Sequence, residues 1–417
     1  MSDVATTTTV ETPAPPPWHP VRLVVTDDLR RSRLTVFFRL LLAIPHFLWI
    51  SLIGSIVALL VIVNWFILLV AARTPKGIHD FVAGYVRYTT QLEAYLFLAA
   101  NPYPGFWLVG EDDYPVTLEI DGPERQNRWK TLFRLPLAVP ALLLSAALLT
   151  GGVRAGGYAA GLAFSIAFLL WWMALFLARV PRGMRDLQCY CIGYSAQLAA
   201  YLFLVTDRYP YSGPNFFVPA REDEPPHPVR VTVTDDLRRS RLLTFFRLPI
   251  AIPHIVWVLL WSIAALVTAL LNWLSALVIG RSPRPFHRFL SRYLRYVSHL
   301  TAFLFMVGNQ FPGFTGKIGT YPIDVELPVL EPQRRLVTLF RLVLVLPALV
   351  VSGGLGGALL VVGVLGWFVG LFLGRMPDGL RNLGAYAIRY STQTNAYLYL
   401  LTERYPDAGP RPDPAAP

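Results

Sequence analysis

Histidine is the residue type whose position in this chain first suggests chemistry. His46 and His254 each follow a proline inside a long apolar run, 208 residues apart. Histidines at membrane depth are rare and often serve as metal ligands or proton carriers. Both nevertheless lie only about two helical turns from an arginine that begins the run. There an interfacial histidine bonded to a headgroup or to backbone needs no further role, and we favour this simpler interpretation.

Other candidates for chemistry are weaker. The acidic pairs at 27–28 and 235–236 precede arginine-rich segments, where helix capping and ion pairing explain them better than metal or phosphate chemistry. Cys189 and Cys191 form an isolated C-x-C, which is too little for a disulfide framework or a metal site. The sequence contains no G-x-S-x-G, H-E-x-x-H or Walker A motif. We therefore expect no catalytic residues, no metal and no cofactor, and a protein that is not an enzyme.

The composition indicates that these residues are held by a membrane protein. Of 417 residues, 54% are hydrophobic and only 15% are charged, whereas soluble domains carry charge on about a quarter of their residues. The net charge is +11, and all but three of the 37 basic residues are arginine. Arginine binds phosphate through a planar fork and suits lipid headgroups, although a GC-rich coding sequence would produce the same bias. We expect anionic lipids as partners and no nucleic acid.

An internal repeat organises the chain. The segment from His19 to Phe106 recurs without a gap from His227 to Phe314. Two weaker copies lie between and after these segments, so the chain reads as four units flanked by tails without signal-peptide features. The predicted divisions are a disordered tail 1–18, unit A at 19–113, unit B at 114–220, unit A′ at 227–320, unit B′ at 321–409, and a tail at 410–417.

Two series of arginines recur in all four units. One series stands in an F-R-L motif where each apolar run begins, and we call these the start arginines. The other stands in an R-x-P motif where the run ends, and we call these the end arginines. We predict that both series bind anionic lipid headgroups. The start arginines are Arg39, Arg134, Arg247 and Arg341, and the end arginines are Arg73, Arg179, Arg281 and Arg375.

The apolar runs are too long for one straight crossing. Residues 40–72 carry no charge and would form a helix of roughly 50 Å, against about 30 Å of hydrocarbon. Glycine-rich stretches at 150–157 and 353–357 favour a turn in the middle of each run, near 51–55 in unit A. The sequence thus predicts a mostly α-helical integral membrane fold of four tandem hairpin repeats with about eight short membrane helices. Re-entrant hairpins or one kinked crossing remain open, because arms of about 16 residues are short.

Two further elements recur beside the hairpins. Stretches of alternating residues at 21–25, 116–120, 229–233 and 323–327 predict strands that could pair into one small β-sheet. After each R-x-P motif, segments such as 77–99 predict an interfacial amphipathic helix, with a third crossing as the alternative. A tyrosine repeated in these segments is expected at headgroup level. Glu93 in the first of them has no acidic counterpart in the other units.

Charge placement predicts the orientation. If every unit is a hairpin, all basic residues except Arg154 lie on one side, which the positive-inside rule assigns to the cytoplasm together with both termini. Within the hairpins of units A and A′, Asn64 and Asn272 are the other polar residues, for which helix packing is the simpler interpretation. With the two histidines they form a possible polar seam, consisting of His46, Asn64, His254 and Asn272.

Several of these motifs resemble a known family. R-L-x-x-x-I-P at Arg39–Pro45, R-x-P…F…R-Y at Arg73–Tyr88 and A-Y-L-F-L…Y-P at Ala94–Pro104 are similar to a bacterial membrane-protein family catalogued as domain of unknown function 4389. The resemblance covers all four units and implies multi-pass residence in the bacterial inner membrane. It supplies no catalytic or binding residues. An insertion of eleven residues around Arg154 departs from the pattern of the other units.

Together these features predict a non-enzymatic multi-pass membrane protein that binds anionic lipid headgroups and organises the membrane or scaffolds partners. A channel or transporter with a path between the hairpins is the alternative, since internal repeats commonly build such paths. The possible polar seam would supply the lining of that path. A lipid-modifying enzyme that uses His46 and His254 is a third hypothesis, but it lacks a nucleophile or a metal partner.

Overall fold

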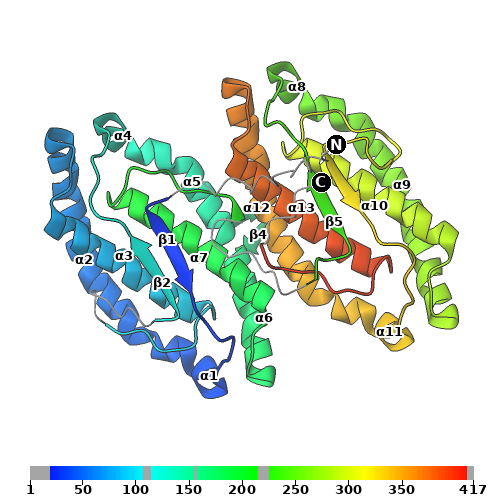
Figure 1. The fold of residues 1–417 in the computed structure, drawn as a ribbon, viewed down its shortest axis with the longest axis horizontal. Helices are drawn as coiled ribbons and strands as arrows, with labels where there is room; N and C mark the ends of the chain where they lie inside the picture. The colour runs from blue at the N-terminus through cyan, green and yellow to red at the C-terminus, as the bar shows by residue number, and fades with distance from the viewer. Residues whose placement is uncertain (1–18, 107–113, 155–156, 215–224, 411–417) are drawn as a thin grey trace, which may run out of the picture.

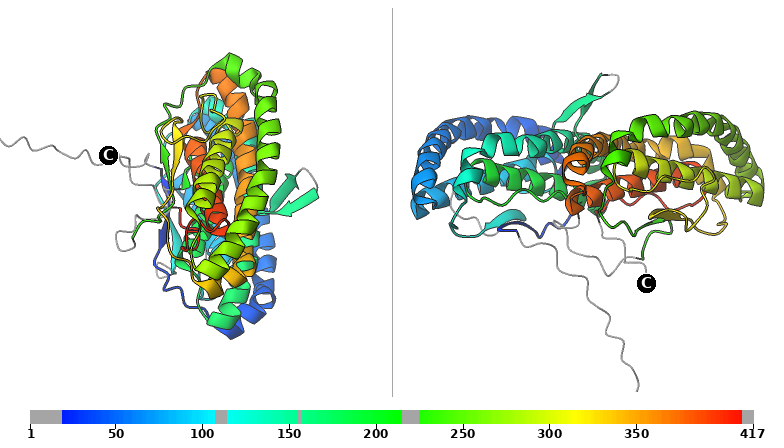
Figure 2. Two further views of the ribbon diagram at one scale, coloured as in Figure 1. Left: turned by 90° about the vertical axis from the view of Figure 1, so that its right-hand side faces the viewer. Right: turned by 90° about the horizontal axis from the view of Figure 1, so that it is seen from above.

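The computed structural model describes residues 19–106, 114–154, 157–214 and 225–410, and these form a flat, three-layered molecule (Figures 1 and 2). An outer layer contains the apolar helices. The middle layer consists of the helices that follow the R-x-P motifs, and short strands make up the third layer. The outer helices are α1 (Arg33–Leu42), α2 (Ile44–Ala71), α4 (Arg128–Leu132), α5 (Arg134–Leu148), α6 (Leu162–Leu177), α8 (Arg241–Phe245), α9 (Arg247–Ile279), α11 (Arg335–Leu344) and α12 (Leu346–Leu373). The middle helices are α3 (Lys76–Leu96), α7 (Arg182–Leu202), α10 (Arg284–Leu304) and α13 (Asp378–Leu398).

The apolar helices that precede the R-x-P motifs, namely α2, α6, α9 and α12, all end in the same way, which explains where the layers separate. The residue after the helix adopts a left-handed conformation, as at Ala72 (φ 55°) and Gly374 (φ 68°). The R-x-P proline then takes the N-cap position of the middle helix, as Pro75 does for α3. A left-handed residue reverses the chain and proline cannot continue a helix interior. The motif therefore ends the apolar helix and starts the middle helix beneath it.

The prediction of eight short membrane helices is wrong. Helices α2, α9 and α12 run without a break, and these three are long and apolar enough to cross a membrane. In α2, the Ser55 hydroxyl donates to the Ser51 carbonyl oxygen at 2.9 Å, a bond within the helix at the expected turn. In α12, a Cβ added to Gly354 would lie 3.0 Å from the Leu162 Cα, so this glycine permits close helix packing rather than a turn.

Only unit B is divided as predicted. Its apolar run forms α5 and α6, which are shorter than a membrane span. Between them lies a β-hairpin of β3 (Gly151–Arg154) and β4 (Gly157–Ala160). This hairpin projects from the face formed by the outer helices (Figure 2). The eleven inserted residues are therefore accommodated outside the layers.

The expected strands are present, but they do not form one sheet. Strand β1 (Val21–Val25) of unit A pairs antiparallel with β2 (Val116–Ile120) of unit B. Separately, β5 (Arg230–Val233) of unit A′ pairs with β6 (Ile323–Glu326) of unit B′. Each sheet thus joins two consecutive units. The molecule therefore has two halves, one made of units A and B and the other of units A′ and B′.

Backbone contacts inside each half are reciprocal. In the first half, the Arg31 amide of unit A donates to the Ala178 carbonyl of unit B at 2.9 Å. The Gln126 amide of unit B donates to the Ala72 carbonyl of unit A, also at 2.9 Å. Corresponding bonds join units A′ and B′, where the Arg239 amide donates to the Gly374 carbonyl. Each half is therefore a pair of units related by approximate two-fold symmetry.

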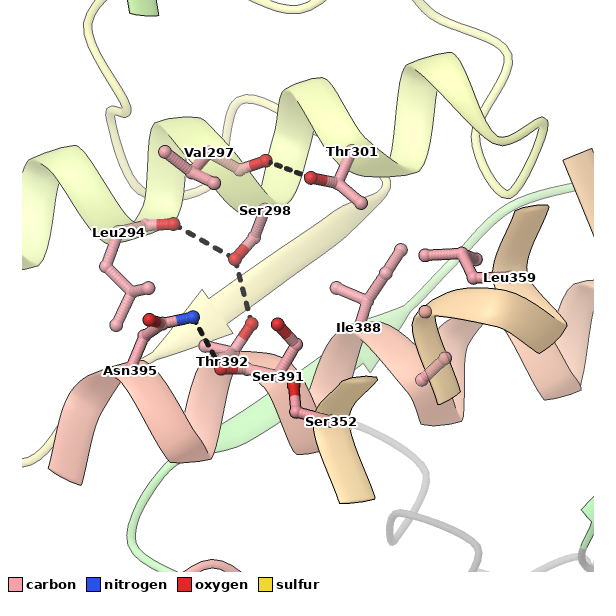
Figure 3. A pocket seen from close by; sticks show the side chains of 12 residues that line it. Leu294, Val297, Ser298, Thr301, Ser352, Leu359, Ile388, Ser391, Thr392 and Asn395 are labelled. Atoms are coloured by element: carbon pink, nitrogen blue, oxygen red, sulfur yellow. Dashed lines mark hydrogen bonds between the residues drawn. The ribbon is translucent and has the colours of Figure 1, made fainter. Parts of the chain in front are cut away.

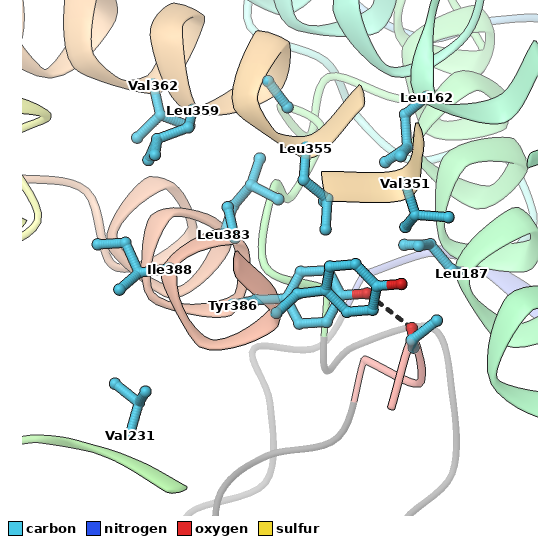
Figure 4. Packing of buried hydrophobic residues seen from close by; sticks show 14 of the residues in the cluster. Leu162, Leu187, Val231, Val351, Leu355, Leu359, Val362, Leu383, Tyr386 and Ile388 are labelled. Carbon is cyan, nitrogen blue, oxygen red and sulfur yellow. Dashed lines mark hydrogen bonds between the residues drawn. The ribbon is translucent and has the colours of Figure 1, made fainter. Parts of the chain in front are cut away.

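The two halves share one central core. Helix α12 packs against α5 and α6 at the middle of the molecule, while α2 and α9 lie at its two ends (Figure 1). Leu162, Val351 and Leu355 are fully buried in this core (Figure 4). The Tyr386 hydroxyl, whose ring extends into the same cluster, donates to the Ala408 carbonyl at 2.6 Å. The central core fixes the halves side by side and leaves the outer helices with one large uncovered face.

Candidate functional site

The start arginines are buried and hold the end of a middle helix. Arg39 is 2% exposed, and its Nη1 donates to the carbonyl oxygens of Tyr95 and Ala100, the latter at 3.1 Å. Its guanidinium carbon lies 4.3 Å from the centre of the Tyr95 ring. Carbonyl groups at the end of a helix have no partner within that helix. Arg39 satisfies them with a charged donor, and we call this arrangement the arginine clamp.

The same clamp occurs in all four units. Each start arginine is at most 3% exposed and lies over an aromatic ring. Each donates to two carbonyl oxygens, one in the last turn of the middle helix and one just after that helix. The two carbonyl oxygens belong to Tyr201 and Thr206 for Arg134, to Phe303 and Gly308 for Arg247, and to Tyr397 and Thr402 for Arg341. The first residue of each pair also supplies the ring.

The clamped segment contains an unfavourable backbone conformation. Leu98 has a φ of 61°, and leucine rarely adopts this left-handed region. The Leu98 carbonyl accepts a hydrogen bond from Arg31 Nη2 at 3.0 Å. Both terminal nitrogens of Arg31 also bind the Asp27 carboxylate at 2.9 Å. Asp27 thus neutralises Arg31 and caps a turn, whereas the sequence predicted that it would cap a helix. Surrounding bonds of this kind are needed to maintain a strained residue.

Units B and B′ use glutamine where units A and A′ use this second arginine. Gln126 accepts from Arg134 Nη2 at 2.8 Å and donates to the Leu204 carbonyl at 2.8 Å. Gln333 accepts from Arg341 Nη2 at 2.8 Å. Neither glutamine is among the residues predicted from the sequence, although each lies eight positions before a start arginine. That fixed spacing is the feature of the sequence that could have identified them.

Burial gives the start arginines a structural role. It lowers the pKa of Arg39 to about 10, so the group remains charged at neutral pH. A guanidinium group without exposed surface does not reach a lipid headgroup, contrary to the role expected from the sequence. The structure places this series inside the fold rather than at the membrane interface.

The end arginines are exposed. Arg73, Arg179 and Arg375 each form a backbone bridge with an arginine of the neighbouring unit, namely Arg125, Arg30 and Arg238. Arg281 bridges to Pro332. These pairs lie at the rim of the molecule, where the outer helices end. Beside Arg238 and Arg375 the surface is hollowed by an open cavity of about 660 Å³. This series therefore keeps free surface for a charged ligand.

The two histidines belong to a buried aromatic cluster. His46 Nδ1 lies 2.6 Å from the Tyr88 hydroxyl, and its ring stacks on Phe106 at 4.3 Å. His254 has the same partner type, with Nδ1 2.8 Å from the Tyr296 hydroxyl. Both histidines are fully buried, and the two tyrosines are at most 1% exposed. Both tyrosines are thus packed inside the fold beneath the outer helices, and their level relative to the headgroups stays a prediction.

The possible polar seam is not assembled. Asn64 Nδ2 donates to Thr74 Oγ1 at 3.2 Å, and Asn272 Nδ2 donates to the Tyr399 carbonyl at 3.0 Å. His46 and Asn64 lie on one helix at a separation of about 27 Å. None of the four residues lines the cavities beside Ser298, Arg238 or Leu304. They stabilise separate contacts between helices and do not line a common path. No group of three or more His, Cys, Asp or Glu placed to bind a metal occurs among the described residues.

A small polar cavity lies between α10, α12 and α13 (Figure 3). Its volume is about 70 Å³. The Ser298 and Thr392 hydroxyl oxygens lie 2.9 Å apart beside it, bridging α10 and α13. Hydroxyl and amide groups supply its polar lining, which consists of Ser298, Thr301, Ser352, Ser391, Thr392 and Asn395. The cavity combines uncharged hydrogen-bonding groups with the apolar side chains of α12.

A carboxylate occupies the corresponding position in the first half. Glu93 aligns with Thr301, and Ser195 aligns with Ser391. The Ser195 hydroxyl donates to Glu93 Oε1 at 3.4 Å. Burial raises the pKa of Glu93 to about 7, and the bond from Ser195 opposes that shift. Glu93 is not among the residues predicted from the sequence, because the other units do not repeat it, yet the structure places it at this polar position.

The fold and these sites define a mostly helical protein with an exposed apolar layer and three helices long and apolar enough to cross a membrane. The family described as "Domain of unknown function (DUF4389)" matches residues 33–108, 241–315 and 335–408, more than half of the chain. The protein belongs to this family. The matches cover units A, A′ and B′, while unit B lies outside them. No curated protein and no solved structure matches the chain.

The clamp predicts that two arginines, Arg39 and Arg73, contribute very differently to the free energy of unfolding. Replacing Arg39→Gln removes the charged donor from two buried carbonyl groups and should lower the free energy of unfolding by about 2–4 kcal/mol. The same replacement at exposed Arg73 should change it by no more than about 0.5 kcal/mol. Chemical unfolding in detergent, followed by tryptophan fluorescence, measures both values. Equal values for the two variants would contradict the clamp.

The raised pKa of Glu93 predicts that the stability of the protein depends on pH. Its pKa is about 7 in the folded protein against an ordinary value of 4.5, so the folded state binds the proton more tightly. The contribution of Glu93 to stability is therefore greatest below pH 4.5 and is lost as the pH rises through about 7. Glu93→Gln should lack this component. Parallel unfolding curves of both proteins between pH 4.5 and 8 test this, and a constant difference between them would be the contrary result.

Proposed function

We propose that the protein is a non-enzymatic membrane protein that lies flat in one leaflet, binds anionic lipid headgroups through its rim, and organises lipids or scaffolds partners on its polar face. The separation of apolar and charged side chains onto different surfaces carries this proposal. The outer helices present the apolar surface. The rim and the strand layer present the charges.

The outer face has the character of a lipid-facing surface. The helices α2, α6 and α12 contain no charged residue, and α5 and α9 contain none after their first residue. Large apolar side chains point outward along their full length, such as Leu48 (71% exposed), Val70 (77%) and Val278 (75%). Soluble monomers rarely expose contiguous apolar patches larger than a few hundred Å². A bilayer is the surrounding that fits such a face.

A flat orientation agrees with packing better than a crossing does. Helix α9 has 33 residues and a length of roughly 50 Å, well beyond the hydrocarbon thickness of about 30 Å. Helix α10 packs along α9 and exposes Arg288 and Arg292. If α9 crossed the bilayer, these arginines would enter the hydrocarbon at about 3 kcal/mol each. When the molecule lies flat, the uncharged helices α2, α6 and α12 enter the hydrocarbon and α10 stays outside it, and no path between helices crosses the membrane.

The rim then meets the headgroups. The end arginines lie where the outer helices leave the apolar face, and each basic residue near an anionic surface contributes about 1 kcal/mol to binding. The strand layer and the described chain ends near His19 and Pro410 lie on the opposite face. By the positive-inside rule we assign that face to the cytoplasm, and the membrane we propose is the bacterial inner membrane.

Depth measurements along the first outer helices test the orientation. Single cysteines replacing Leu40, Ile56 and Val70, in a protein whose Cys189 and Cys191 are changed to alanine, should carry a fluorophore at equal depth. A crossing helix would place position 56 deepest and the other two at opposite surfaces. Quenching by lipids brominated at different chain positions measures the depth. A label at Glu119 on β2 is the control and should remain in water.

The end arginines should confer the anionic preference. Changing Arg73, Arg179, Arg281 and Arg375 together to glutamine should remove most of the phosphatidylglycerol retained by the purified protein in native mass spectra, because each contributes about 1 kcal/mol. The matched control removes the same charge from the strand face. Its four changes, also to glutamine, are Arg22, Arg208, Arg230 and Lys317. Equal loss in both variants would show that net charge, and not the rim, holds the lipid.

A further inference from the structure

We propose that Glu93 and Ser195 form a binding site for the primary ammonium group of an amine-bearing lipid headgroup. The inference rests on the proposed function, because the site faces the layer that the proposal places in the membrane. Four observations support it: the direction of the two side chains, the cavity at the equivalent position, the lack of an ion pair, and the depth of the middle layer.

Both side chains lie on the helix faces that turn away from the strands. On α3, Arg87 Nε donates to the Leu118 carbonyl of β2 at 3.0 Å, which fixes the strand-facing side. Glu93 lies six residues further on, about 240° around the helix. On α7, Gln197 Nε2 donates to the Val21 carbonyl of β1 at 3.1 Å, and Ser195 lies about 200° away from it. Glu93 and Ser195 therefore meet beneath the outer helices.

The equivalent position in the second half is an open space. There Thr301 and Ser391 line the cavity of about 70 Å³ between the middle helices and α12 (Figure 3). The aligned residues in units A′, B and B′ are Thr301, Ala199 and Asn395, so the packing of a unit does not require a carboxylate. Glu93 is thus an addition to a shared frame, at a position whose counterpart in the second half lines a cavity.

The carboxylate has an incomplete set of partners. Glu93 takes part in none of the ion pairs formed within the described residues, and Ser195 supplies its hydrogen bond. Burial raises its pKa, which means that the charged carboxylate is disfavoured at this position. An ammonium group would supply the missing positive charge and hydrogen-bond donors. Glu93 and Ser195 offer acceptor oxygens, which a primary ammonium can use and a quaternary ammonium cannot.

The depth of the site suits a headgroup. In the flat arrangement the outer helices lie among the upper acyl chains. The middle helices lie about 8–10 Å closer to water, which is one helix-packing distance. Glu93 then lies at headgroup level. A lipid of the same leaflet can place its amine at Glu93 while its chains extend past the outer helices into the bilayer.

Competition between two zwitterionic lipids tests the site. Protein in micelles that contain equal phosphatidylethanolamine and phosphatidylcholine, with constant phosphatidylglycerol, is analysed by native mass spectrometry. Wild-type protein should retain phosphatidylethanolamine over phosphatidylcholine by about tenfold, the effect of one charge-assisted hydrogen bond. Glu93→Gln should reduce the ratio to about one, and Ser195→Ala should give an intermediate ratio. An unchanged ratio in Glu93→Gln would overturn the proposal.

The controls separate recognition from folding and from membrane binding. Thr301→Val alters the equivalent position of the second half and should keep the wild-type ratio; a loss equal to that of Glu93→Gln would overturn the proposal. Thermal unfolding verifies that each variant is folded. Displacement by free ethanolamine, dependent on Glu93, would show that the amine alone suffices, and retention against it would show that the acyl chains contribute. Failure of the flat arrangement appears in the depth pattern of wild-type protein. Failure of this site leaves that pattern intact.

Discussion

The arginine clamp is the interaction on which the rest of the structure depends. A buried guanidinium group is costly unless its charge and donors are satisfied, and here two carbonyl oxygens and an aromatic ring satisfy it. The clamp joins the start of an apolar run to the end of the following middle helix, so it fixes where both begin and end. Arginine and first carbonyl are 56 residues apart in units A, A′ and B′ and 67 in unit B. The extra residues of unit B leave the layers as the β3–β4 hairpin, and the clamp keeps its geometry.

Because the clamp satisfies the backbone carbonyls at the end of every middle helix, these helix ends can be buried. Apolar and charged side chains then lie on different surfaces of the unit. The strand layer covers the middle helices from one side and the outer helices cover them from the other. What remains exposed is an apolar face, a rim of arginines and the charged face of the strand layer. Reciprocal bonds between units, such as Arg31 to Ala178, then place the end of one outer helix beside the start of its neighbour. This geometry brings the arginines of the rim together in pairs.

Features decided by local sequence could be predicted, and features decided by packing could not. The strands, the middle helices and the helix ends at R-x-P follow from alternation, amphipathicity and proline, and the structure contains them. The expected turn near 51–55 rests on bilayer thickness and on the glycine-rich stretches of units B and B′, and bilayer thickness limits only a helix that crosses. The glycines near 354 resembled a break, but a neighbouring helix at Leu162 explains them. The burial of Arg39 was not visible in the sequence, because its carbonyl partners lie 56 residues away and an arginine beside an apolar run usually reaches toward water.

Four aligned units in one chain also separate structural positions from functional ones. A position that forms the same contact in every unit, as the start arginines do, is required by the frame. A position that differs while the frame stays the same is free to serve another purpose. Units A and A′ have His46 and His254 where units B and B′ have Ala141 and Ala348. Each histidine is hydrogen-bonded to a tyrosine of its own unit, so packing within the unit explains this difference. Packing within the unit does not explain Glu93 in the same way. Its carboxylate faces the apolar layer with a hydroxyl group as its hydrogen-bond partner, and a buried charge without a counterion is unfavourable unless a ligand compensates it.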